Sequence, residues 1–97
     1  MVVISYSLLR NYVNAKPDIR TALEDWYFKT KAAEWKNIAE LRQTFNTVDF
    51  VGNDRFVFNI KGNNYRLVAM IFFNRRTLYI RFIGTHKEYD AINVSTI

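Results

Sequence analysis

Apolar residues recur with helical spacing in the first third of the chain. Residues 6–16 carry them at Leu8, Leu9, Tyr12 and Val13, and steps of one, three and four are typical of an amphipathic helix. Ser5, directly before this run, is a favoured N-cap residue. Because the residue before a proline avoids the α conformation, Pro17 ends this helix near Ala15 or Lys16 and opens a second one that reaches about Ala33.

The second helix carries an apolar stripe that would face a core. Its members are Ile19, Ala22, Leu23 and Trp26, followed by Tyr27 and Thr30. Asn37 is another N-cap candidate, and residues 38–44 have the pattern of a short helix. Two adjacent helices of this kind predict a hairpin that covers a sheet. We expect Trp26 and Trp35 to pack between helices and sheet, with base stacking as the alternative.

The rest of the chain has the patterns of strands. We expect strands at residues 2–4, 48–51, 56–60, 65–73 and 77–85. Residues 65–73 are almost continuously apolar, which is typical of a central strand buried on both faces. The intervening Gly62-Asn63-Asn64 and Asn74-Arg75-Arg76 are short turns, and such turns favour antiparallel hairpins. Residues 86–92 predict a last helical turn, followed by a polar tail.

Strict alternation assigns the strand residues to two faces of the sheet. In residues 56–60, Phe56, Phe58 and Ile60 point to one face. In residues 77–85, alternation places Leu78, Ile80 and Phe82 on one face and Tyr79, Arg81 and Ile83 on the other. The sheet should therefore have one apolar face and one face that carries Asn59, Lys61 and Arg81.

Charge is unevenly distributed along the chain. The 97 residues, enough for a single domain spanning 1–97, carry a formal net charge of +5. Residues 51–97 hold seven Lys and Arg against three Asp and Glu, and residues 55–81 hold six cations and no acid. A cationic sheet favours a polyanionic partner, and RNA is the leading candidate. A solubilising surface charge is the alternative.

Several classes of site are disfavoured. The chain has no cysteine and one histidine, so we expect no disulfides, no thiolate zinc site and no bound metal. No signal peptide is visible at the first residues, and the longest apolar run, residues 67–73, is too short to span a membrane. A soluble cytoplasmic protein without membrane contact is the expectation.

Four stretches of the sequence resemble the HigB toxins of the RelE superfamily. They are VIS near the start, AEW after the second helix, VFNIKGNNYRLV, and the closing YIRFIGTHKEYD. The resemblance implies an α+β fold. It has a small, mainly antiparallel sheet of four or five strands, an N-terminal helical hairpin packed on one side, and a short C-terminal helical turn.

The resemblance also implies a function. The family's members are ribosome-dependent endoribonucleases that cut translated mRNA without a metal or organic cofactor. A helix-turn-helix antitoxin of the HigA type neutralises the toxin, and the pair contacts operator DNA only through the antitoxin.

RNA cleavage by 2′-OH attack needs a base, an acid and cations that stabilise the phosphorane. By resemblance, we assign Lys61 and Arg66 to phosphate stabilisation and His86 to the acid. Tyr89 would position the scissile phosphate or stack on a base, and Asp90 lies at the right spacing to orient the imidazole.

The remaining RNA contacts are assigned to Asn59, Asn64, Arg81 and Asp90. The chain departs from many RelE relatives at two places. Only Lys61 remains of an alternating lysine run, and His86 stands where those relatives have an arginine. The base is therefore open between His86 and Tyr89. Two rival functions are a non-catalytic RNA- or ribosome-binding module and a degenerate toxin that regulates through its antitoxin.

Overall fold

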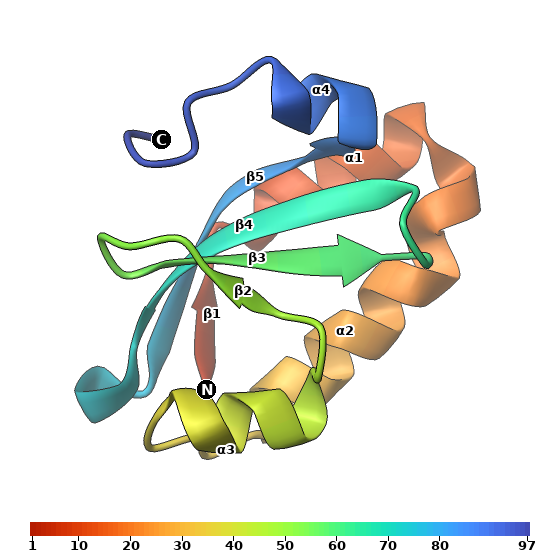
Figure 1. The fold of residues 1–97 in the computed structure, drawn as a ribbon. Helices are drawn as coiled ribbons and strands as arrows, with labels where there is room; N and C mark the ends of the chain where they lie inside the picture. Colours follow the sequence, from red (N-terminus) through yellow and green to blue (C-terminus); the bar gives the residue numbers. More distant parts are fainter.

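A five-stranded sheet forms the centre of the computed structural model, which describes all 97 residues (Figure 1). The strands are β1 (Val2–Ile4), β2 (Asp49–Phe50), β3 (Arg55–Ile60), β4 (Tyr65–Phe72) and β5 (Thr77–Thr85). Their order is β1-β5-β4-β3-β2, with β1 parallel to β5 and every other pair antiparallel. The central place of β4 confirms the interpretation of its continuous apolar run.

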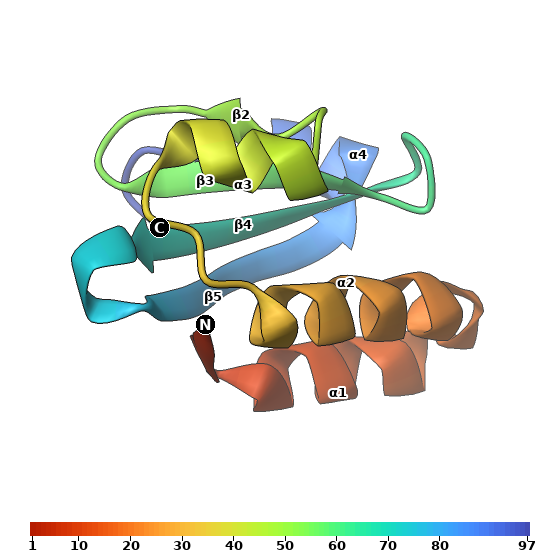
Figure 2. The ribbon, with the colours of Figure 1, turned by 90° about the horizontal axis from the view of Figure 1, so that it is seen from below.

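The chain contains four α-helices. They are α1 (Tyr6–Ala15), α2 (Arg20–Ala32), α3 (Ile38–Thr44) and α4 (His86–Asp90), with 3-10 turns η1 (Pro17–Ile19) and η2 (Phe73–Arg75). Figure 2 shows α1 and α2 side by side along one side of the sheet, so the predicted hairpin and the α+β class are confirmed. Pro17 differs from expectation, because it opens a separate 3-10 turn and not the α-helix itself.

The main core lies between the hairpin and the sheet. It is a cluster of 18 buried residues in which Trp26 meets the ring of Phe58 edge-on at 5.4 Å. Trp26 and Trp35 are 2% and 4% exposed, and the indole Nε1 of Trp35 donates to Thr44 Oγ1 at 2.9 Å. Both indoles therefore pack in the core, as expected, and neither is free to stack on a base.

The two N-cap predictions have different outcomes. The side chain of Asn37 accepts a hydrogen bond from the Glu40 amide at 3.0 Å, which confirms it as the cap of α3. Ser5 occupies the N-cap position of α1 but adopts a left-handed φ of 72° and makes no side-chain capping bond. The Ser5 prediction is wrong in this respect, because the chain turns sharply there from β1 into α1.

Strict alternation fails in β5 at Arg81. Val68 of β4 pairs with Phe82, and the next residue of β4, Ala69, pairs with Ile80, so Arg81 is an extra residue in a β-bulge. After the bulge, each side chain of β5 lies on the face opposite to the one that strict alternation assigns to it. Ile83 is 5% exposed and belongs to the core with Leu78 and Ile80, while Phe82 shares the other face with Val68. The predicted faces of Phe82 and Ile83 were therefore wrong.

The segment after α4 runs back toward the turn between β2 and β3 (Figure 1). The side chain of Asn53 donates to the Ser95 carbonyl at 3.4 Å, and Arg55 Nε donates to the main-chain oxygen of Ile97 at 2.7 Å. The sheet face opposite the hairpin is thus partly covered by the chain's own last residues. None of the four helices combines the length and the apolar character that a membrane crossing requires.

Candidate active site

Most of the predicted site residues meet at the end of the sheet where the β3–β4 turn lies against the start of α4. The His86 amide donates to the Asn64 carbonyl at 3.1 Å. In the sheet, Arg66 of β4 lies opposite Asn59 of β3 on one side and Gly84 of β5 on the other. Directly opposite residues share a face, so Asn59 and Arg66 lie side by side, and Gly84 stands two residues before His86.

The imidazole of His86 is held by a carboxylate on its own helix. Its Nδ1 lies 3.2 Å from Asp90 Oδ2, and the two side chains are 56% and 59% exposed. The spacing of four residues brings them to the same side of α4. Because Nδ1 faces Asp90, Nε2 is the nitrogen left for a substrate, and Asp90 has the orienting position expected of it.

The Arg66 guanidinium is held by main-chain oxygens and by no carboxylate. Its Nη1 donates to the carbonyls of Asn63 at 3.0 Å and Tyr65 at 3.2 Å. The three ion pairs in the structure are Lys29–Asp25, Lys61–Asp18 and His86–Asp90, and none of them includes Arg66. The charge of Arg66 is oriented but not neutralised, which suits a phosphate-binding group.

The Lys61 side chain lies apart from Asn59, Arg66 and His86, although strict alternation placed it on the same face as Asn59. It follows the last residue of β3 with a left-handed φ of 53°, and its Nζ lies 3.0 Å from Asp18 Oδ2. The Tyr65 hydroxyl donates to the same Asp18 oxygen at 2.9 Å. Hydrogen bonds from Lys61 and Tyr65 lower the pKa of Asp18, and the bond to Asp18 raises the pKa of Tyr65.

Two further predicted residues lie at different distances from the cluster. Tyr89 is half-buried on α4, three residues after His86, and so belongs to the same end of the sheet. Arg81 is exposed in the bulge, three residues before Gly84. It therefore lies roughly 10 Å along β5 from the position opposite Arg66. The structure therefore does not bring Arg81 to His86.

Glu88 and Tyr12 were missed by the sequence reasoning. Thr85 and Glu88 form a reciprocal capping box at the start of α4, and Tyr12 of α1 donates its hydroxyl to Glu88 Oε1 at 2.9 Å. Bonds from the Thr85 amide and from Tyr12 lower the pKa of Glu88, while burial and the bond to Glu88 raise the pKa of Tyr12. The capping box was readable as Thr-x-x-Glu, but no local pattern indicates Tyr12.

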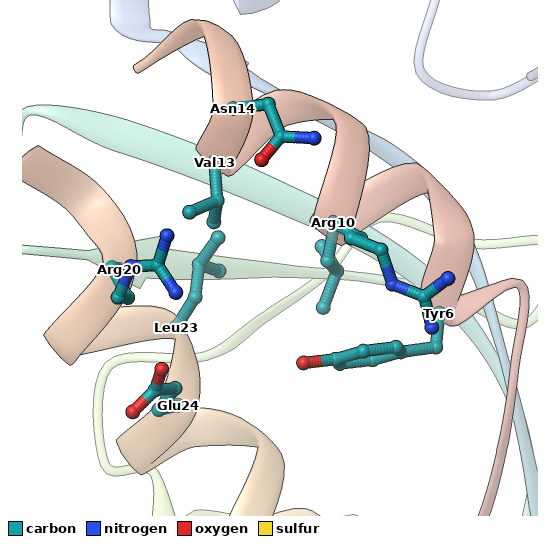
Figure 3. A pocket seen from close by; sticks show the side chains of 8 residues that line it. Tyr6, Arg10, Val13, Asn14, Arg20, Leu23 and Glu24 are labelled. Atoms are coloured by element: carbon teal, nitrogen blue, oxygen red, sulfur yellow. The ribbon is translucent and has the colours of Figure 1, made fainter. Parts of the chain in front are cut away.

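The site is an open surface and not a cavity. The best-formed pocket lies between α1 and α2, where Arg10 and Asn14 face Arg20 and Glu24 above an apolar floor (Figure 3). Neither this pocket nor the other two contain any of the predicted site residues. A surface that presents oriented polar groups without a pocket fits a long polymeric substrate better than a small molecule.

Comparison with known proteins identifies close relatives. Residues 19–92 match the model of the HigB toxin family, described as the RelE-like toxic component of a toxin–antitoxin system. The mRNA interferase toxin HigB of Escherichia coli K12 is 35% identical over 92 residues, which cover 93% of this chain and 88% of that protein. The mRNA interferase HigB of Escherichia coli O6:H1 is 28% identical over 94 residues, covering 95% and 91% respectively.

Proposed function

The chain belongs to the HigB family of RelE-like toxins, and from this we propose that it is an endoribonuclease that cuts mRNA at the surface formed by Arg66, His86 and their neighbours. Membership of a toxin–antitoxin family implies an antitoxin partner. The observation that carries the assignment of the site is an unneutralised Arg66 guanidinium on the strand paired with the one that leads into His86, whose Nδ1 faces Asp90 and leaves Nε2 for a substrate.

The proposed chemistry is attack of a ribose 2′-oxygen on the adjacent phosphorus as the 2′-hydroxyl gives up its proton to solvent water. The P–O5′ bond breaks, a 2′,3′-cyclic phosphate forms, and the 5′-oxygen leaves with a proton. Protonated His86 supplies that proton from Nε2 while Asp90 holds Nδ1. Arg66 donates to the non-bridging oxygens, whose negative charge grows in the transition state. Tyr89, on the same helix, is proposed to position the scissile phosphate.

Lys61 takes part in this proposal only if it leaves Asp18. Their pair is exposed on both sides, with side-chain exposures of 42% and 52%, and exposed ion pairs are readily exchanged because water and salt screen them. A phosphate diester approaching the β3–β4 turn offers the ammonium an equivalent anionic partner. We propose that Lys61 exchanges Asp18 for the substrate phosphate when RNA binds.

The partners are proposed at a finer level than the family description gives. The RNA is mRNA under translation on the ribosome, in the cytoplasm, and the sheet half of the chain supplies the cationic contacts. Asn59, Asn64 and Arg81 contribute polar contacts along the RNA strand. The antitoxin is a helix-turn-helix protein of the HigA type, and operator DNA is contacted only through it.

The test is inducible expression in bacteria with mapping of mRNA 5′ ends, comparing wild type with His86→Ala. Growth arrest with new in-frame cuts, lost in a folded His86→Ala variant, is the expected result. Cuts that persist in the variant keep the enzyme but remove His86 as the acid.

Arrest without new 5′ ends would favour a non-catalytic ribosome-binding module. A folded wild type that binds the antitoxin but causes neither arrest nor cuts would instead favour a degenerate regulatory toxin.

A further inference from the structure

We infer that Tyr12 of α1 is a positioning residue for the active site, acting through Glu88 to set the place of α4. Its hydroxyl lies 2.9 Å from Glu88 Oε1, across a sequence separation of 76 residues. The inference rests on the proposed function for its effect on cleavage, but the placement of α4 can be tested without any activity.

The helix that carries His86 is too short to be stable by itself. It spans the five residues of α4, whereas isolated helices shorter than about 12 residues are marginal in water. The capping box stabilises the first turn of α4, but both of its members, Thr85 and Glu88, belong to the same segment. It therefore favours a helix without fixing where that helix lies.

Only contacts to other elements can fix the direction of α4. One is the bond from the His86 amide to the Asn64 carbonyl, which fixes the first residue of the helix. A second is the hydrogen bond from Tyr12 to Glu88, two residues further on. Two anchored points define a line, so the Tyr12 bond determines how α4 is oriented about its first residue and where the ring of His86 points.

One carboxylate oxygen performs both tasks. Glu88 Oε1 accepts from the Thr85 amide at 2.7 Å and from the Tyr12 hydroxyl at 2.9 Å. The charged acceptor strengthens both bonds. Capping and positioning are therefore coupled at one atom. Without the Tyr12 hydroxyl, Glu88 can still accept from the Thr85 amide and cap α4, but the helix is no longer tied to α1 and can move.

Gly84 supports the same placement from the side of the sheet. A Cβ at Gly84 would lie 3.1 Å from both Cβ and Oε1 of Glu88 and 2.6 Å from Cζ of Phe82. The stem of Glu88 thus packs directly against the main chain of β5, and a methyl group there would displace it. Tyr12 donates to the carboxylate of the same side chain, so Glu88 is located by the sheet on one side and by α1 on the other.

Tyr12→Phe tests the proposal, because it removes the hydroxyl and keeps the ring. Tyr6→Phe is the matched control: Tyr6 lies on the same helix, its ring packs on Tyr27 at 4.5 Å, and its hydroxyl makes no hydrogen bond to α4. His86 is the only histidine, so its ring gives one resolvable NMR signal. That signal should shift or broaden in Tyr12→Phe and stay in place in Tyr6→Phe.

Cleavage of ribosome-bound mRNA gives the second readout. Since misplacement by about 1 Å can cost 10²-fold, we expect a drop in kcat of about tenfold or more in Tyr12→Phe. KM should be unchanged, because Arg66 is untouched. In a Glu88→Ala background, Tyr12→Phe should cause no additional loss, since the partner of the hydroxyl is already gone.

An unmoved His86 signal in Tyr12→Phe overturns the proposal whatever the rate. A moved signal with an unchanged kcat overturns Tyr12 as a positioning residue for catalysis. If the wild type cleaves no RNA, the proposed function fails, and the NMR comparison still decides whether Tyr12 places α4. Gly84→Ala should move the same signal from the other side.

Discussion

At the scale of single residues, Arg66 combines an unpaired guanidinium with a place opposite Gly84, two residues before His86. Arg55 is also unpaired and held by main-chain oxygens, but it lies at the other end of β3. Main-chain carbonyls of Asn63 and Tyr65 orient the Arg66 guanidinium, whereas Lys29 and Lys61 are paired with carboxylates. An oriented, unneutralised guanidinium can donate two parallel hydrogen bonds to a phosphate without first breaking an ion pair. This is the strongest physical reason for placing the scissile phosphate beside β4.

Arg66→Ala should lower kcat for mRNA cleavage by about 10²- to 10³-fold, the usual cost of removing one donor to a developing oxyanion. Arg66→Lys should recover only part of that loss, because an ammonium cannot form the fork. Single-turnover cleavage on programmed ribosomes measures both. Arg42→Ala, on α3, is the charge-matched control, and equal losses in Arg42→Ala and Arg66→Ala would contradict the assignment.

The lowered pKa of Asp18 predicts an acid-dependent part of the stability. Above the unfolded-state pKa of about 3.9, Asp18 is ionised in both states and its contribution is fully present. As the pH falls toward the lower pKa of the folded state, only the unfolded chain takes up a proton, so the contribution is lost. The free energy of unfolding should therefore fall more steeply below about pH 4 in wild type than in Asp18→Asn.

Urea unfolding measured between neutral and acid pH tests this expectation. Glu88 also has a lowered pKa, so a residual acid slope should remain in Asp18→Asn. Parallel curves for wild type and Asp18→Asn would show that the contacts of Asp18 with Lys61 and Tyr65 do not form in solution.

Whether a contact can be predicted from the sequence depends on how far apart its two residues lie along the chain. The pairing of His86 with Asp90 was predictable, because a spacing of four residues on a helix brings them together. The partner of Lys61 was not, since Asp18 lies 43 residues away. The role of Tyr12 was not predictable for the same reason, since its partner Glu88 lies 76 residues away and their contact depends on how the hairpin packs at the end of β5.

At the scale of elements, every predicted strand and helix exists, because their apolar periods are strong and their turns carry Gly, Asn or Pro. The parallel pairing of β1 with β5 was not readable from those periods. Nor was the bulge at Arg81, since a bulge is defined by the partner strand and leaves the local composition of β5 unchanged. One extra residue reverses every face after it.

The bulge makes Ile83 a core residue and Arg81 a surface residue. Ile83→Ala should lower the free energy of unfolding by about 2–5 kcal/mol, as other large-to-small core substitutions do. Arg81→Ala should change it by no more than about 0.5 kcal/mol, because an exposed side chain without structural contacts contributes little. Urea denaturation measures both values. Similar costs for the two variants would mean that the strand keeps strict alternation through Arg81.

At the scale of the whole molecule, cations and the candidate site belong to the same half of the chain. Residues 51–97 supply β3, β4, β5 and α4, together with a net charge of +4, while residues 1–50 supply the hairpin and a net charge of +1. The hairpin thus acts mainly as a support, and its Tyr12 and Asp18 contact Glu88 and Lys61 across the layer boundary. On the proposed function, the sheet half is the part expected to meet RNA.

This division predicts which charges govern salt dependence. Arg75 and Arg76 lie in and after η2 on the sheet half, and neither forms an ion pair. Replacing both by Ala should reduce the slope of log K against log salt for ribosome binding by about 1 for each phosphate that is no longer neutralised. Replacing Lys31 and Lys36 of the hairpin half should leave the slope unchanged. Equal reductions in the two double variants would mean that the uneven charge only keeps the chain in solution, and the RNA path would then have to be sought beyond the sheet.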